Sequence, residues 1–140
     1  MRPIYESAAD RDNERSVIDA IAERWKCDAW KLPLAYRMDY ALARGTSIKA
    51  FAEVKCRSNE RGAYDDYMLS LAKLAHARRL AEISLLPVYL VVRWSDGVGF
   101  CDLSAIIYRV EAGGRTDRND PQDMEPVAMI SVDQFKQFNA

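Results

Sequence analysis

The sequence has few of the residues that mark disulfide-rich, metal-thiolate or repetitive proteins. Its 140 residues include three cysteines, six glycines, five prolines and a single histidine. The cysteines are odd in number and widely spaced, which argues against a disulfide framework and against a paired zinc site. We therefore expect Cys27, Cys56 and Cys101 to be buried free thiols in a reducing compartment.

Long apolar runs are also missing. No segment is long and apolar enough to span a bilayer, and Glu6 and Asp10 interrupt the N-terminus where a signal peptide would have its apolar core. We therefore expect a cytoplasmic protein with no membrane partner. The formal net charge is only −1. This value argues against a protein that coats nucleic acid, but it still allows a local basic patch.

The composition that remains is that of an ordinary globular protein. Hydrophobic residues make up 49% of the chain and charged residues 29%. A chain of this length is most simply one domain, so we expect a single domain over residues 1–140, with 1–10 as a loose N-terminal arm.

The pattern of apolar residues predicts alternating helices and strands. Apolar positions three and four apart indicate a helix over 12–25, capped by Asp12 or Asn13, and a Leu- and Ala-rich stretch indicates a second over 65–84. A helical turn is expected over 133–138. Strands are expected over 27–32, 38–43, 47–56, 88–94, 98–103, 106–112 and 127–132, with polar loops over 57–65 and 113–126. This order predicts an α/β fold with a central mixed β-sheet flanked by α-helices.

The segment 38–57 has the clearest chemical pattern. After a turn at Gly45, alternate residues from Ile48 to Cys56 are apolar, and the residues between them are charged except for Phe51. Because side chains alternate across a strand, Glu53 and Lys55 share one face. Asp39 on the preceding strand is in a position to join them. An ordinary solvated face with a cross-strand ion pair is the alternative.

This acidic cluster suits a hard divalent cation. Mg²⁺ and Mn²⁺ bind carboxylate and carbonyl oxygens, so Asp39 and Glu53, with the carbonyl of Val54, are candidate metal ligands. Lys55 beside them would orient or deprotonate an attacking water and offset phosphate charge. A lysine beside two acids stays charged easily, which favours the orienting role.

A further carboxylate could come from the first helix. Glu14 lies in its first turn and is the candidate outer acid, with Glu23 as the competitor for that role. A glutamate there can also simply complement the helix dipole.

Two regions offer candidate contacts to nucleic acid. Lys73 is expected near the start of the second helix, on one face with Tyr67 and Ser70, where it would touch phosphate. Arg115 and Arg118 lie in a glycine-containing segment that could approach a phosphate backbone. The alternatives are a solvated helix surface for Lys73 and a plain strand connection for the two arginines.

The layout of these residues and elements resembles that of the PD-(D/E)XK nuclease superfamily. This superfamily has the restriction-endonuclease-like fold and includes Holliday junction resolvases and many phage nucleases. Asp39, the run Glu53-Val54-Lys55 and Glu14 in a preceding helix carry the resemblance. Met38 stands where the motif has proline, a position that varies widely in the superfamily.

The resemblance implies a Mg²⁺- or Mn²⁺-dependent nuclease. By similarity, Asp39 and Glu53 would be metal ligands, Lys55 the catalytic lysine and Glu14 an accessory acid. We expect DNA as the substrate, a phage or prophage origin and possible homodimers, as in many proteins with this fold. The alternatives are a non-catalytic module that binds nucleic acid or protein on the same fold, and a structural α/β protein with incidental acids.

Overall fold

The computed structural model describes residues 8–114 and 124–138. In these stretches the α-helices are α1 (Ala8–Trp25) and α2 (Leu71–Ser84). The strands are β1 (Asp28–Lys31), β2 (Tyr40–Arg44), β3 (Ser47–Cys56), β4 (Asp66–Ser70), β5 (Val88–Trp94), β6 (Gly97–Asp102), β7 (Arg109–Gly114), β8 (Met124–Ser131) and β9 (Lys136–Phe138). Short 3-10 helices are η1 (Leu34–Tyr36), η2 (Arg61–Ala63) and η4 (Val132–Gln134).

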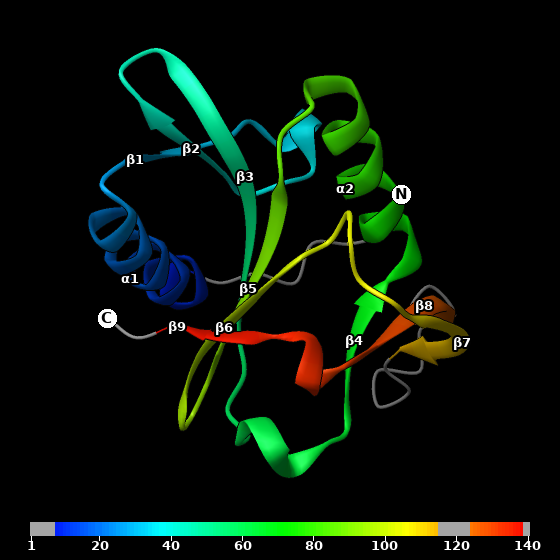
Figure 1. Cartoon of the computed structure of the whole chain (residues 1–140). Helices are drawn as coiled ribbons and strands as arrows, with labels where there is room; N and C mark the ends of the chain where they lie inside the picture. The colour runs from blue at the N-terminus through cyan, green and yellow to red at the C-terminus, as the bar shows by residue number, and fades with distance from the viewer. Residues whose placement is uncertain (1–7, 115–123, 139–140) are drawn as a thin grey trace.

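A mixed six-stranded sheet lies at the centre, with the strand order β1-β2-β3-β5-β6-β9 (Figure 1). β3 and β5 are parallel, and the other neighbouring pairs are antiparallel. α1 covers one face of this sheet, where its Ile18 and Ile21 are fully buried in a cluster with Ala52 and Val54 of β3. The predicted mixed sheet packed against helices is confirmed.

The alternation predicted for β3 places its two sets of side chains on opposite faces. Ala50, Ala52 and Val54 belong to the apolar cluster under α1. Phe51 belongs to the second cluster, on the side of α2. Glu53 is therefore directed to the α2 side of the sheet, because strand side chains alternate.

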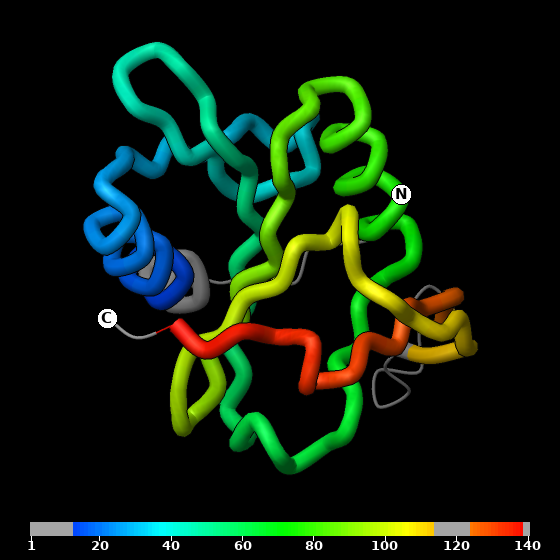
Figure 2. Tube along the Cα trace, viewed as in Figure 1, coloured from blue at the N-terminus to red at the C-terminus, as the bar shows by residue number. Residues whose placement is uncertain are grey.

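The second face carries more than a helix. α2 packs there through Leu74 and Ala77, together with a separate three-stranded sheet in the order β4-β8-β7 (Figures 1 and 2). The sequence predicts only one sheet, so the second is a correction. Residues of both sheets share one apolar cluster, including Leu90 of β5 and Ile130 of β8.

The predicted helix over 65–84 is wrong at its start. Residues Asp66–Ser70 form β4, which pairs antiparallel with β8. Tyr67 and Leu69 are buried and Met68 is exposed, which is the period of a strand. Ser70 ends the strand and caps α2, accepting a hydrogen bond from the Lys73 backbone N–H at 3.4 Å. Tyr67, Ser70 and Lys73 therefore do not share a helix face.

Three other boundaries differ from the predictions. α1 begins at Ala8, so residues 8–10 are helical rather than part of a loose arm, and neither Asp12 nor Asn13 caps it. Residues 1–7 lie outside the described residues. The strand expected over 106–112 runs over Arg109–Gly114, and the turn expected over 133–138 divides into η4 and β9. No disulfide joins the three cysteines, of which only Cys101 is buried.

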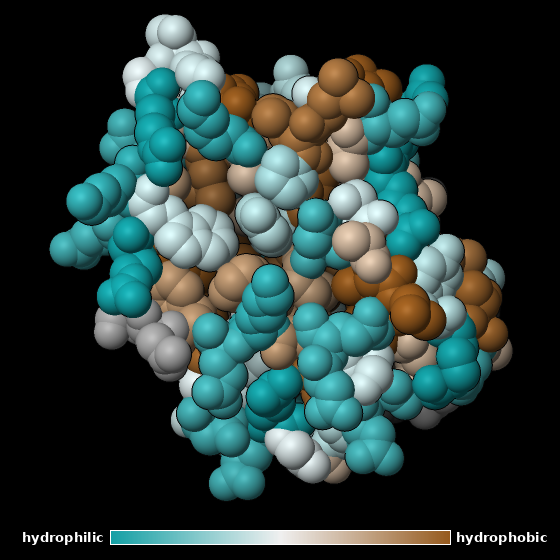
Figure 3. Space-filling model, viewed as in Figure 1, coloured by the Kyte–Doolittle hydropathy of each residue, from teal (hydrophilic) through white to brown (hydrophobic). Residues whose placement is uncertain are grey.

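The surface is polar over much of the face drawn in Figure 3, with apolar side chains gathered over the end of α2 and the start of β5. Ile83 and Leu85 are exposed in that region. Neither described helix combines the length and apolar character that crossing a membrane requires.

Candidate active site

Glu53 is the most deeply buried charged side chain among the described residues, with 1% of its surface exposed. Two lysines approach its carboxylate. Lys73 Nζ lies 2.9 Å from Oε2, and Lys55 Nζ lies 3.8 Å from Oε1. No hydrogen bond of good geometry reaches Oε2 from the part of the chain that the structure describes. The ion pair with Lys73 is thus the main partner of this oxygen. A carboxylate buried this deeply is costly without a cation beside it, so the position suits a site that receives one.

Asp39 lies where β2 stops pairing with β3. Its backbone N–H donates to the Ala52 carbonyl at 3.1 Å, and its Oδ2 accepts a hydrogen bond from the Val54 N–H at 2.8 Å. The carboxylate thus takes the place of a strand neighbour along the free edge of β3. Its Oδ1 lies 3.5 Å from Lys31 Nζ, and the side chain is 16% exposed.

The carboxyl group of Asp39 lies close enough to affect the protonation of Glu53. The pKa of Glu53 is raised to about 7, chiefly by burial and then by the neighbouring Asp39 carboxylate, through its charge and a side-chain hydrogen bond. The ammonium groups of Lys55 and Lys73 act in the opposite direction. Without a bound cation, Glu53 therefore holds its proton more tightly than an exposed glutamate does.

Lys55 follows Glu53 on the same face of β3 and keeps 34% of its side chain exposed. Burial lowers its pKa, but the negative charge of Glu53, with smaller effects of Tyr67, Asp39 and Glu14, raises it above the usual value. The side chain is therefore an ammonium at neutral pH, 3.8 Å from the Glu53 carboxylate.

Glu14 comes to this region from α1. It is buried, with 7% exposure, whereas its competitor Glu23 is exposed. The charge of Glu14 raises the pKa values of Lys55 and Tyr40. Of the two candidate acids in α1, the structure brings Glu14 toward the cluster.

Lys73 lies inside the cluster rather than on an open helix surface. Its Nζ contacts Glu53 and donates to the carbonyl of Arg37 at 2.6 Å. Arg37 ends η1 in the left-handed region, with φ of 58°, and precedes Asp39 by two residues. Lys73 therefore links α2 both to Glu53 and to the segment that positions Asp39.

For two other predicted site groups, the predicted role stays a prediction. Val54 is fully buried toward α1, and its N–H is held by Asp39; its carbonyl as a metal ligand stays a prediction. Arg115 and Arg118 lie outside the described residues.

Sequence reasoning missed Lys31 and underestimated Tyr67. Lys31 on β1 lies against Asp39 and over the ring of Tyr40, at 5.1 Å from its centre. Tyr67 is buried near Lys55 and Glu53. It raises the pKa of Lys55, while Lys55 lowers and Glu53 raises the pKa of Tyr67. A basic residue one strand away from a predicted carboxylate is the only signal that the sequence offers for Lys31.

The donor set is compatible with one hard divalent cation. Asp39 and Glu53 supply adjacent carboxylate oxygens, and Mg²⁺ commonly takes one or two carboxylates with water completing its shell. Within 8–114 and 124–138, no group of three or more histidine, cysteine, aspartate or glutamate side chains is arranged to hold a metal. A site built on two protein carboxylates needs no third.

Solved structures with the same fold include two proteins that act on nucleic acid by their titles. One is Hjc from Archaeoglobus fulgidus, a Holliday junction resolvase from an archaeal hyperthermophile, with a TM-score of 0.56 and 17% identity over 89% of each chain. Another is D212, a nuclease from a fusselovirus, with a TM-score of 0.50 and 11% identity, covering 97% of this chain and 90% of that one. At these identities the likeness shows the restriction-endonuclease-like fold alone.

A search of curated proteins gives no match. A protein-family model does match, over residues 1–138, and it is described as "Phage putative PDDEXK endonuclease". The match includes Asp39, Glu53, Lys55 and Glu14 and covers nearly the whole chain. The chain therefore belongs to this family of PD-(D/E)XK nucleases.

Proposed function

We propose that the protein is a Mg²⁺- or Mn²⁺-dependent nuclease that hydrolyses phosphodiester bonds in DNA, encoded by a phage or prophage. The observation that carries the proposal is the pair of close carboxyls at the free edge of β3, where the buried Glu53 carboxylate is approached by the ammonium groups of Lys73 and Lys55. Membership of a phage endonuclease family and the likeness to a Holliday junction resolvase support the DNA substrate and the origin.

In this proposal Asp39 and Glu53 hold the cation, with the carbonyl of Val54 as a further ligand. A bound divalent ion supplies charge that polarises the scissile phosphate and lowers the pKa of a bound water. Asp39 is already oriented by its hydrogen bond to the Val54 N–H, so the ligand position is set before the ion arrives. Glu53 is held by Lys73, a positioning residue that also balances its charge.

Lys55 is the proposed catalytic lysine. As an ammonium on a partly exposed side chain, it can donate hydrogen bonds to the attacking water and to a phosphate oxygen. Its raised pKa favours this orienting and electrostatic role over proton abstraction. Glu14 is the proposed accessory acid, placed to bind or orient water on the α1 side of the cluster.

The test is cleavage by the purified chain. Supercoiled, linear and branched DNA would be incubated with Mg²⁺ or Mn²⁺, and products separated on gels. We expect cleavage by the wild type and a loss of at least about a hundredfold in rate for Glu53→Ala and for Lys55→Ala. Lys49→Ala, which removes an exposed lysine from the same strand, should cleave like the wild type.

Two results would contradict the proposal. Cleavage that survives both Glu53→Ala and Lys55→Ala would place the activity at another site or in a contaminant. Tight DNA binding without cleavage in either metal would favour the non-catalytic binding module.

A further inference from the structure

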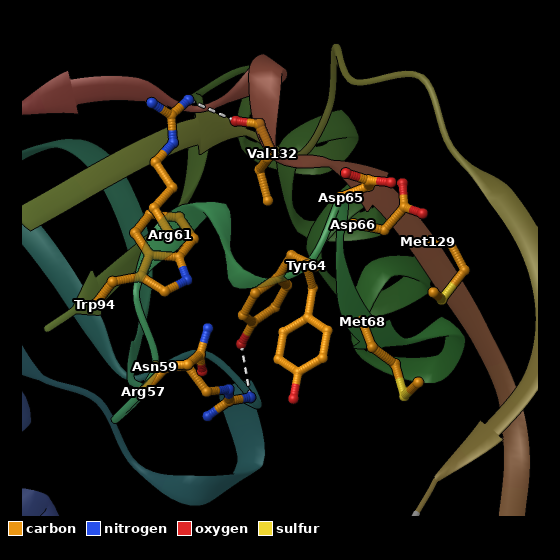
Figure 4. Close-up of a pocket in the computed structure, with 11 residues that line it drawn as sticks. Arg57, Asn59, Arg61, Tyr64, Asp65, Asp66, Met68, Trp94, Met129 and Val132 are labelled. Atoms are coloured by element: carbon orange, nitrogen blue, oxygen red, sulfur yellow. Dashed lines mark hydrogen bonds between the residues drawn. The ribbon is translucent and has the colours of Figure 1, made fainter. Parts of the chain in front are cut away.

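A cavity of about 580 Å³ lies at the carboxyl ends of the parallel strands β3 and β5 (Figure 4). Its other walls come from the segment around η2, from β4 and from β8. Trp94 and Arg61 lie on one side of it and Met68 and Met129 on the other, with Tyr64 between them. In open α/β sheets, ligands bind outside the carboxyl ends of the parallel strands. The volume is in the range of pockets that hold small organic ligands.

The cavity lies beyond the carboxylate cluster along β3, and neither Glu53 nor Lys55 is part of its lining. Arg57 follows β3 two residues after Lys55, so it continues the face that carries Glu53 and Lys55. Tyr67 forms a cavity wall, and its hydroxyl group lies close enough to Lys55 to shift the pKa of that lysine. A molecule whose phosphate lies at Glu53 could therefore extend directly into the cavity.

The walls are aromatic and apolar. Tyr67 and Trp94 are buried, with 5% and 4% exposure, and line its inner part. Tyr64 and Met68 are exposed, at 67% and 43%, and line its outer part. An aromatic side chain exposed beside a buried aromatic floor is typical of surfaces on which bases stack.

Three of the four charged side chains of the walls have partners within the folded chain. Arg57 donates to the Tyr67 hydroxyl at 2.8 Å and lies over its ring. Arg61 donates to the carbonyls of Val132 and Phe135 at 2.7 and 3.0 Å. Among the two aspartates of the wall, Asp66 pairs with Arg109 at 2.9 Å. The formal charges of the lining, two arginines and two aspartates, sum to zero, which favours a neutral flat ligand over a phosphate group.

We propose that the cavity receives one unstacked base of the nucleic acid that is cut at Glu53. The inference rests on the proposed nuclease function and adds a substrate feature to it. Tyr64 stacks on the base at the outer part, Met68 covers its other side, and Asn59 and Asp65 add polar groups to the lining. Because a base must leave the stack to enter, the enzyme prefers substrates with an unpaired nucleotide beside the cut bond.

The experiment has two stages. Wild-type protein with Mn²⁺ first maps the bond that is cut in end-labelled oligonucleotides. The Glu53→Gln chain then binds the same oligonucleotides, each with a base-free tetrahydrofuran residue at one of three positions on either side of that bond. Affinity is measured by fluorescence anisotropy.

We expect one position at which removal of the base weakens binding roughly 5- to 150-fold, the range for one base stacked on an aromatic side chain. Adding Tyr64→Ala to the Glu53→Gln chain should abolish that difference, and Tyr64→Phe should retain it. Tyr36→Ala is the matched control, since Tyr36 is also exposed, at 53%, and does not line the cavity. It should leave the difference unchanged.

The outcomes separate the two proposals. Cleavage with no base-dependent position, or a base dependence that Tyr64→Ala leaves intact, overturns the base site alone. Failure of the wild type to cleave any substrate overturns the nuclease and, with it, the base site.

Discussion

Opposing influences set the pKa of Glu53: burial and the neighbouring Asp39 carboxyl raise it, and two lysines lower it. Its side chain is 1% exposed, and its pKa is raised to about 7 by burial and by Asp39. Lys73 and Lys55 reduce that effect without cancelling it. A protein that only needed stability would place an apolar residue here, so the carboxyl is a local cost that a functional site explains.

The first prediction concerns the stability of the metal-free protein. The pKa of Glu53 is about 7 when folded and near its usual 4.5 when unfolded. Between these values the folded state holds the proton more tightly, so stability falls as pH rises from about 4.5 to 7. The expected loss is about 3 kcal/mol, an order of magnitude from the size of the shift.

The measurement is denaturant unfolding in EDTA at pH 5 and pH 8. Glu53→Gln, which is neutral at both, should lose much less stability between them than the wild type does. The other titrating groups, His76 included, are common to both chains and cancel in the comparison. An equal pH dependence in the two chains would mean that Glu53 titrates as an exposed carboxyl does.

For individual residues, the sequence predicts those features of the site that the local alternation of side chains determines. The alternation along β3 is enough to place Glu53 and Lys55 on one face. The contacts of Lys73 with Glu53 and of Lys31 with Asp39 join residues distant in sequence, and no local pattern encodes them. Burial separates Glu14 from Glu23, and it depends on how α1 packs on the sheet.

Among the elements, β2 and β3 define the site by their unequal lengths. β2 begins at Tyr40, which pairs with Ala52, while β3 continues to Cys56. The edge of β3 beyond that point would expose the Val54 N–H, and the Asp39 carboxylate accepts its hydrogen bond. One side chain thus ends a strand pair and presents a metal-ligating oxygen.

The second prediction separates these two roles of Asp39. Asp39→Asn keeps an oxygen that can accept from the Val54 N–H, whereas Asp39→Ala leaves that buried N–H without its acceptor. Both remove the charge beside Glu53, so the difference in unfolding free energy between them isolates the hydrogen bond. We expect the alanine variant to be less stable than the asparagine variant by about 1–3 kcal/mol, and both to lose cleavage.

Chemical denaturation at pH 7 in EDTA gives the stability difference, and a gel assay gives the activity. Full cleavage by Asp39→Asn would show that the charge of Asp39 is not needed to hold the cation. Equal stability of the two variants would show that the hydrogen bond to Val54 contributes nothing to the fold.

The element that the sequence could not reveal is β4. Residues 65–84 contain many helix formers and no glycine or proline, so helix propensity extends the predicted helix to Asp65. The pairing of β4 with β8, some sixty residues later, overrides that propensity for five residues. By contrast, the hairpin at Gly45 and the β5–β6 hairpin were predictable because their turns are local.

At the scale of the whole molecule, the candidate site lies where three layers meet. β3 supplies Glu53 and Lys55, α1 supplies Glu14 on one side, and α2 supplies Lys73 on the other. The small sheet adds Tyr67 from β4. A ligand at the carboxylates therefore binds groups from separate elements at once and should stabilise the folded chain as a unit.

The last prediction is that a divalent cation raises the unfolding temperature. An ion at one hundred times its dissociation constant adds about 2.7 kcal/mol, which corresponds to several degrees for a chain of this size. Because the ion competes with the proton on Glu53, whose pKa is about 7, the shift should grow between pH 6 and pH 8. EDTA should reverse it.

Differential scanning fluorimetry with Mn²⁺, Mg²⁺ and no metal measures the shift. Glu53→Gln and Asp39→Asn should abolish it, while Glu82→Gln, which changes an exposed side chain on α2, should retain it. A shift that persists in both site variants would locate the ion elsewhere. If millimolar metal does not shift the unfolding temperature of the wild type, the buried carboxyls bind no cation. Lys55 alone offers no means of activating water. The same fold would then act by binding nucleic acid or protein without cutting.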